Sequence, residues 1–173
     1  TEGKIIRDAF MPGDQWFVTG DLLKRDEDGD YWFVDRVGDT FRWKGENVST
    51  EEVGKVIQRA SCVGLTTVYG VQLEGHEGRA GVAAVQLSNG HRFDPDELFH
   101  LVEASLAPAA RPRFIRIIEA FETTGSHKVV KHRLQNEGVD PTTIQDKIYW
   151  YNSEKRTYTT LAKNRYKTVL AKL

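Results

Sequence analysis

Three short stretches of the chain combine residue types that are suited to binding or to chemistry. The first is the turn Thr19-Gly20-Asp21, which presents one carboxylate after an extended segment. A carboxylate placed in this way can accept two hydrogen bonds from a vicinal diol, which is how proteins often hold a ribose. Such turns are common, so this stretch alone also fits an ordinary surface turn.

The second stretch runs from Asp35 to Asn47 and reads DRVGDTFRWKGEN. Gly38 lacks a Cβ and can absorb the large change in backbone angles that a hinge requires. Arg36 offers a planar fork of N–H groups that suits phosphate or ribose oxygens. Taken singly, these residues also describe a charged hairpin.

The third stretch, TTGSHKVVK, covers residues 123–131. Lys128 stands on a loop that contains glycine and serine, and such a lysine can swing into a site. There its ammonium group can place a positive charge on a developing phosphate anion. Without further context, a solvated loop lysine explains the same pattern.

Other common catalytic and metal-binding patterns are missing from the sequence. There is no Gly-rich Walker loop, GxSxG, HExxH or CxxC. The five histidines lack metal-type spacing, and most of them are expected at the surface. Cys62 follows an apolar helical face and is expected to be a buried, inert thiol. A single cysteine excludes an internal disulfide and fits a reducing compartment.

Charge is distributed unevenly along the 173 residues. The net charge is only -1, which does not give the global field of a nucleic-acid-binding protein, so we expect no nucleic-acid partner. Residues 147–173, however, carry seven basic and one acidic side chain, interleaved with aromatic residues. This tail fits either a strand and helix with solvated lysines or a contact with anionic lipid or an acidic partner. We expect no membrane span and no apolar signal-peptide core, hence a cytoplasmic chain, with peripheral membrane contact through the tail as an option.

The pattern of elements predicts an α+β fold. The first forty residues read as strands and turns, and Gly45-Glu46-Asn47 is expected to break the strand before it. Ser49 with Glu52 predicts a capped helix, and Asp94 with Pro95 predicts a second. Strands are expected at 66–71, 81–87 and 114–118, which together with these helices predicts a small mixed sheet flanked by helices.

Taken together and in this order, the three stretches resemble the C-terminal end of the adenylate-forming enzymes. TGDL, DRxGDxFRWKGENVS before a capped helix, and TxGxxKxxK carry the resemblance, which runs from about Lys4 to the end of the chain. The segment GDTFRWKGENVST is similar to the corresponding sequences of the branch that contains fatty-acid transport proteins and very-long-chain acyl-CoA synthetases.

The resemblance implies a role for each candidate residue. Asp21 would bind the ribose hydroxyls of ATP and Arg36 would contact the nucleotide. Gly38 would be the hinge, where many relatives have Asp or Lys. Lys128 would stabilise charge as a carboxylate attacks the α-phosphate, although His127 stands where the family usually has glycine. The segment formed by Trp43, Lys44, Gly45 and Glu46 would belong to a protruding hairpin and line the pantetheine tunnel of CoA.

The same resemblance predicts the domain organisation. Residues 1–37 would be the trailing β segment of a large N-terminal adenylation domain, and residues 38–173 a small mobile C-terminal domain. The full enzyme would use fatty acid, ATP, Mg²⁺ and CoA. The 173 residues alone would bind no cofactor and form no acyl-AMP, because the phosphate loop and the acyl tunnel would lie upstream. The alternative is a non-catalytic interaction or membrane-surface module of the same fold.

Overall fold

The computed structural model describes residues 4–36, 40–123 and 129–173, without the side chains at positions 22 and 33–36. The chain forms two compact units, Thr1–Asp39 and Thr40–Leu173. The expected boundary at Gly38 lies outside the described residues, so the domain boundary remains a prediction.

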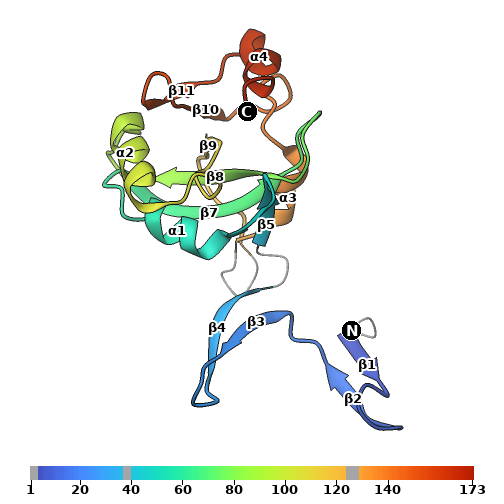
Figure 1. Cartoon of the computed structure of the whole chain (residues 1–173). Helices are drawn as coiled ribbons and strands as arrows, with labels where there is room; N and C mark the ends of the chain where they lie inside the picture. Colours follow the sequence, from blue (N-terminus) through green and yellow to red (C-terminus); the bar gives the residue numbers. More distant parts are fainter. Residues whose placement is uncertain (1–3, 37–39, 124–128) are drawn as a thin grey trace. The chain divides into compact units, whose positions relative to one another are not determined.

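The first unit consists of two antiparallel strand pairs (Figure 1). Strand β1 (Ile5–Arg7) pairs with β2 (Gln15–Phe17), and β3 (Asp21–Arg25) pairs with β4 (Tyr31–Arg36). Among the described residues, all buried apolar side chains belong to the second unit. The first unit instead exposes most of its large apolar side chains, namely Ile6, Phe10, Met11, Trp16, Phe17, Val18, Leu23, Tyr31 and Trp32.

The second unit is built on a five-stranded mixed sheet in the order β11-β10-β9-β8-β7. The strands are β7 (Val63–Val71), β8 (Ala80–Leu87), β9 (Phe114–Ile117), β10 (Lys147–Asn152) and β11 (Thr157–Thr160). Neighbours are antiparallel except for β8 and β9, which run parallel. A parallel pair needs a crossover, and here the crossover contains helix α2 (Pro95–Ser105; Figure 1).

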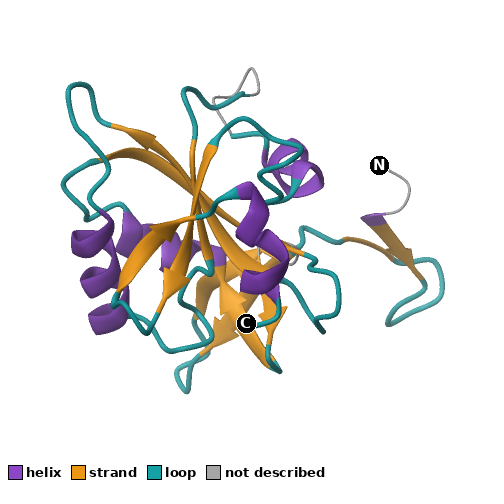
Figure 2. Cartoon of the chain, turned by 90° about the horizontal axis from the view of Figure 1, so that it is seen from above, coloured by secondary structure: helices purple, strands orange, loops and turns teal. Residues whose placement is uncertain are grey.

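Helices lie on either side of the fan of strands (Figure 2). Both predicted helix starts are confirmed. Ser49 accepts the backbone N–H of Glu52 at the start of α1 (Thr50–Ile57), and Asp94 accepts two backbone N–H groups at the start of α2 (Pro95–Ser105). The remaining helices are α3 (Lys131–Glu137), the short 3₁₀ helix η2 (Lys163–Arg165) and α4 (Tyr166–Leu170). The predicted α+β class with a mixed sheet is therefore correct.

The basic tail is an integral part of the second unit. It supplies the two strands β10 and β11 and the C-terminal helices, and Ile148, Tyr151, Tyr158 and Val169 are buried. All seven of its basic side chains are exposed to solvent. Across the described ranges of the chain, we find no helix of the length and apolarity that a membrane span requires.

Candidate functional site

Strands β5 (Thr40–Trp43) and β6 (Glu46–Ser49) form a tight antiparallel hairpin. Trp43 pairs with Glu46, so Lys44 and Gly45 alone make the turn, with φ of 50° and 85°. Two successive positive φ values are typical of a type I′ hairpin turn, whose twist matches the flanking strands. The expectation that Gly45-Glu46-Asn47 breaks the chain is therefore wrong for Glu46 and Asn47, which already belong to β6.

The hairpin is held firmly against β7 and β8. The backbone N–H of Arg79 donates to the carbonyl of Arg42 at 2.7 Å, and Trp43 forms an isolated bridge with Gly78. A Cβ at Gly78 would lie 2.4 Å from the Arg42 carbonyl oxygen, and φ there is +81°. Only glycine therefore allows this close approach of two backbones.

The four residues expected at a pantetheine tunnel divide into one core residue and three surface residues. Trp43 is 1% exposed, and its ring centroid lies 5.7 Å from that of His76. Lys44, Gly45 and Glu46 are exposed, and the Lys44 ammonium lies 5.8 Å from the centroid of the Trp43 ring. The indole of Trp43 is thus part of the hydrophobic core, whereas Lys44, Gly45 and Glu46 remain accessible to a ligand.

Asp21 and Arg36 are brought together by the β3–β4 hairpin. They are register partners at the open end of this pair, with Asp21 the first residue of β3 and Arg36 the last of β4. The backbone N–H of Asp21 donates to the Thr19 hydroxyl at 3.1 Å, and the Asp21 residue is half-buried. The two residues predicted to bind a nucleotide are thus neighbours across one pair of strands.

Gly38 and Lys128 lie outside the described residues, but the segments that flank Lys128 are well defined. Thr123 and Val129 form an antiparallel bridge, and the N–H of Val130 donates to the carbonyl of Glu122 at 2.9 Å. Arg133 Nε lies 3.3 Å from Glu122 Oε2. Thr123 and Val129, the described residues on either side of this gap, are therefore held close together.

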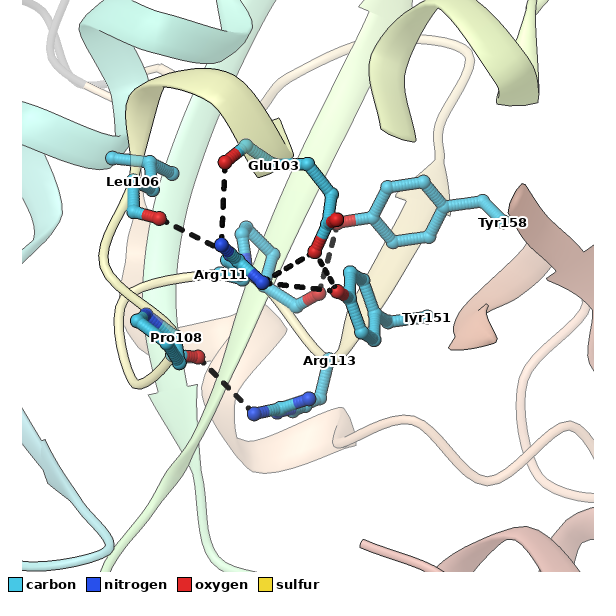
Figure 3. A network of polar contacts seen from close by, with 8 residues as sticks. Glu103, Leu106, Pro108, Arg111, Arg113, Tyr151 and Tyr158 are labelled. Atoms are coloured by element: carbon cyan, nitrogen blue, oxygen red, sulfur yellow. Dashed lines mark hydrogen bonds and ion pairs between the residues drawn. The ribbon is translucent and has the colours of Figure 1, made fainter. Parts of the chain in front are cut away.

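A polar network that sequence reasoning missed joins α2, the segment before β9, and β10 (Figure 3). Both Arg111 and the Tyr151 hydroxyl donate to the carboxylate of Glu103, and Arg111 also donates to the Leu106 carbonyl at 3.1 Å. The hydrogen bond from Tyr151 lowers the pKa of Glu103, desolvation opposes this, and the charge of Arg111 adds to the lowering. No sequence signal could have found the network, because it depends on which strands become neighbours.

A second missed network lies on the other side of β9. The buried Arg116 donates to Asp146 at 2.7 Å and to Glu137 on α3 at 2.5 Å. Arg116 also lines a cavity of about 460 Å³ together with Glu122, Arg133 and Asp146. Both arginines of the cavity form ion pairs with carboxylates, so we assign this cavity a structural role. In the described ranges, no three or more His, Cys, Asp or Glu side chains are arranged so that they could hold a metal ion.

The comparisons with known proteins now identify the domain. Residues 52–128 match the family described as AMP-binding enzyme C-terminal domain. This segment of the chain is similar to that family of domains. The resemblance inferred from the three stretches is therefore confirmed, and residues 52–128 include the helix after the hairpin and most of the sheet.

Similar proteins extend the match over nearly the whole chain. Long-chain fatty acid transport protein 3 from Homo sapiens is 46% identical over 98% of this chain and 25% of its own length. Among solved structures, ATP-bound MatB from Rhodopseudomonas palustris has a TM-score of 0.65 at 26% identity, covering 79% of this chain and 26% of that one. Fatty acyl CoA synthetase from Mycobacterium tuberculosis has a TM-score of 0.57 at 28% identity, covering 75% and 25%. This chain thus spans about a quarter of the length of these relatives.

Proposed function

We propose that this chain acts as the C-terminal portion of an AMP-forming acyl-CoA synthetase for long-chain fatty acids. The observation that carries the proposal is the accessible Lys44-Gly45 turn on a domain of the AMP-binding C-terminal family. Similarity to a long-chain fatty acid transport protein and to a fatty acyl CoA synthetase supports the substrate class.

In the first half-reaction, a fatty carboxylate attacks the α-phosphate of ATP, which is accompanied by Mg²⁺, and forms acyl-AMP and pyrophosphate. Asp21 holds the ribose hydroxyls and Arg36 contacts the nucleotide. Lys128 places its ammonium beside the α-phosphate, where negative charge develops in the transition state. The pairing of Asp21 with Arg36 in the register of β3 and β4 supports their joint role.

In the second half-reaction, the thiolate of CoA attacks the acyl carbonyl and displaces AMP. A rotation about Gly38 withdraws Lys128 and brings the β5–β6 hairpin to the site, so one small domain serves both steps in turn. Lys44, Gly45 and Glu46 then border the path of the pantetheine arm. Glycine suits this position because a ligand can approach its backbone closely.

The first unit would pack against the rest of an N-terminal adenylation domain. The exposed apolar side chains of that unit support this part of the proposal, because so much apolar surface on so few residues is typical of a surface that another domain covers. Residues 1–37 would then be the trailing strands of that domain, and residues 38–173 the mobile one.

Peripheral contact with anionic lipid through residues 147–173 is a second proposal. It is favoured by the exposure of all seven basic side chains of the tail. Co-sedimentation with liposomes rich in phosphatidylserine tests this proposal. The unmodified chain is compared with a variant in which Lys163, Arg165 and Lys167 are changed to Gln. Equal sedimentation of the two proteins would show that these side chains are solvated and do not bind lipid.

The main proposal is tested by release of pyrophosphate from ATP in the presence of a long-chain fatty acid. We expect release from a full-length protein that contains this sequence and none from the 173-residue chain alone. Release by the chain alone would refute the division of labour between the two domains. An inactive full-length protein would refute the enzymatic role and favour a non-catalytic interaction module.

A further inference from the structure

Gly70 and Gly81 stand opposite each other as register partners of β7 and β8. Neither glycine has a positive φ, so the backbone conformation does not require glycine at these two positions. A glycine inside a strand weakens that strand and often marks a place where another segment approaches closely. Here the approaching segment is β5, which lies against β7 and β8 and places the buried Phe41 over the two glycines (Figure 1).

The side chain of Phe41 spans both glycines. A Cβ built at Gly70 would lie 2.5 Å from Phe41 Cβ and 2.9 Å from Phe41 Cγ. A Cβ built at Gly81 would lie 2.7 Å from Phe41 Cζ and 3.2 Å from Phe41 Cε2. The near end of the side chain therefore rests on Gly70 and the far end of the ring rests on Gly81. We call these two glycines the glycine slot.

The glycine slot helps to set the orientation of the β5–β6 hairpin on the sheet. A two-stranded hairpin by itself is marginally stable at best in water, so this hairpin depends on its contacts with β7 and β8. The slot fixes Phe41, and the hydrogen bond from the Arg79 N–H fixes the carbonyl of the next residue, Arg42. The turn at Lys44 begins only roughly 10 Å further along the strand. A displacement at the slot is therefore transmitted to the turn, because close-packed interiors transmit strain.

A methyl group at Gly70 would displace the hairpin itself. The nearest atom is the Cβ of Phe41, which is fixed by the backbone of β5 and cannot be moved by rotating the side chain. To increase this separation from 2.5 Å to the 3.4 Å of ordinary van der Waals contact, β5 must shift by about 1 Å. A misplacement of about 1 Å can slow a reaction by roughly a hundredfold, even when the substitution lies far from the reacting atoms.

We propose that Phe41, Gly70 and Gly81 are positioning residues for the transfer of the acyl group to CoA. They set the position of the Lys44-Gly45 turn, which the proposed function places beside the pantetheine arm, and the inference rests on that function. The adenylation step does not use this turn, so the slot should affect one half-reaction and spare the other.

The test compares the two half-reactions in one preparation of the full-length enzyme. In Gly70→Ala, the ratio of acyl-CoA formation from supplied acyl-AMP to pyrophosphate release should fall at least about tenfold. This ratio does not depend on the fraction of protein that is folded. Gly54→Ala is the matched control, because its Cβ would meet Val68 of the same strand β7 at an ordinary 3.8 Å, and it should leave the ratio unchanged.

The two glycines should respond differently when Phe41 is shortened. Phe41→Leu removes the Cε and Cζ atoms that an alanine at position 81 would meet, but it keeps the Cβ and Cγ that an alanine at position 70 would meet. In the Phe41→Leu background, Gly81→Ala should therefore change the ratio less than twofold, whereas Gly70→Ala should retain its full effect. This double-mutant cycle separates the slot from a general loss of packing. Gly81→Ala keeps the test valid even if Gly70→Ala does not fold, because its clash is with the far end of a side chain.

The displacement of the turn can be measured without any enzymatic activity. In ¹⁵N–¹H spectra of the 173-residue chain, the amide signals of Lys44 and Gly45 should shift in Gly70→Ala and stay in place in Gly54→Ala. Unshifted signals in the Gly70 variant would overturn the inference. In an enzyme that forms acyl-CoA, the same ratio in the Gly70 and Gly54 variants would overturn this inference alone, as would an equal loss of both half-reactions. An unmodified full-length protein that forms no acyl-CoA would sink the proposed function, and this inference with it.

Discussion

Asp21 and Arg36 stand opposite each other as register partners of β3 and β4. Directly opposed residues of antiparallel strands have Cα atoms about 4.5–5.5 Å apart, so one ligand can contact both. This pairing is what we expect of two residues that hold the same nucleotide.

Replacing Asp21 with Ala should therefore weaken the binding of ATP in the full-length enzyme. Loss of two hydrogen bonds to the ribose hydroxyls should raise KM for ATP roughly tenfold or more. Asp28→Ala is the matched control, because Asp28 is an exposed carboxylate in the turn of the same hairpin. Steady-state kinetics measures this KM. The same KM for ATP in both variants would show that Asp21 does not bind the nucleotide.

The approach of the hairpin to Gly78 predicts a local cost in stability. Gly78→Ala would place a Cβ against the Arg42 carbonyl at positive φ, and should lower the free energy of unfolding by roughly 2 kcal/mol or more. Gly75→Ala is the control, because Gly75 has φ of +78° but open space around it, and should cost about 1 kcal/mol. Urea unfolding of both variants measures the difference, and equal costs would show that the hairpin is not held by this contact.

The network around Glu103 predicts a dependence of stability on pH. Because the pKa of Glu103 is lowered in the folded state, its stabilising contribution is complete above the unfolded pKa of about 4.3 and is lost as the pH falls through the folded value. Glu103→Gln should therefore flatten the decline in stability at acidic pH, measured as free energies of unfolding from pH 6 downwards. Glu119→Gln, at an exposed position, should leave the decline unchanged. An unaltered decline in the Glu103 variant would contradict the pairing.

Sequence patterns predicted the elements better than the contacts between them. Ser49 and Asp94 were sufficient to locate both helix starts, because capping depends on residues only two or three positions apart. The turn at Lys44-Gly45 was predicted one residue too late, because a lysine at positive φ has no compositional signal and is imposed by the pairing of Trp43 with Glu46.

The candidate site was predicted as separate motifs, but the polar networks around Glu103 and Arg116 were not predicted. Arg111 carries no motif, and only the antiparallel pairing of β9 with β10 brings it near Tyr151. Such long-range arrangements depend on the order of strands in the sheet, which local periodicity does not encode.

A hinge at Gly38 predicts opposite effects on the two half-reactions. Gly38→Pro would fix φ and hinder the rotation, so transfer of the acyl group to CoA should slow while acyl-AMP formation persists. Gly38→Ala, which leaves φ free to rotate, should retain much more of the transfer step. Rapid-quench kinetics measures both steps. If the Pro variant transfers acyl groups to CoA at the rate of the unmodified enzyme, Gly38 is not the hinge.

The central claim is that Lys128 stabilises charge in the adenylation step alone. The most direct measurement compares the two half-reactions in the full-length enzyme carrying Lys128→Ala, with Lys131→Ala from the same motif as control. We predict that pyrophosphate release falls at least about a hundredfold, as expected when one donor to a developing anion is removed, while acyl-CoA formation from supplied acyl-AMP is nearly intact. Equal loss in both half-reactions, or no loss of pyrophosphate release, would contradict the account.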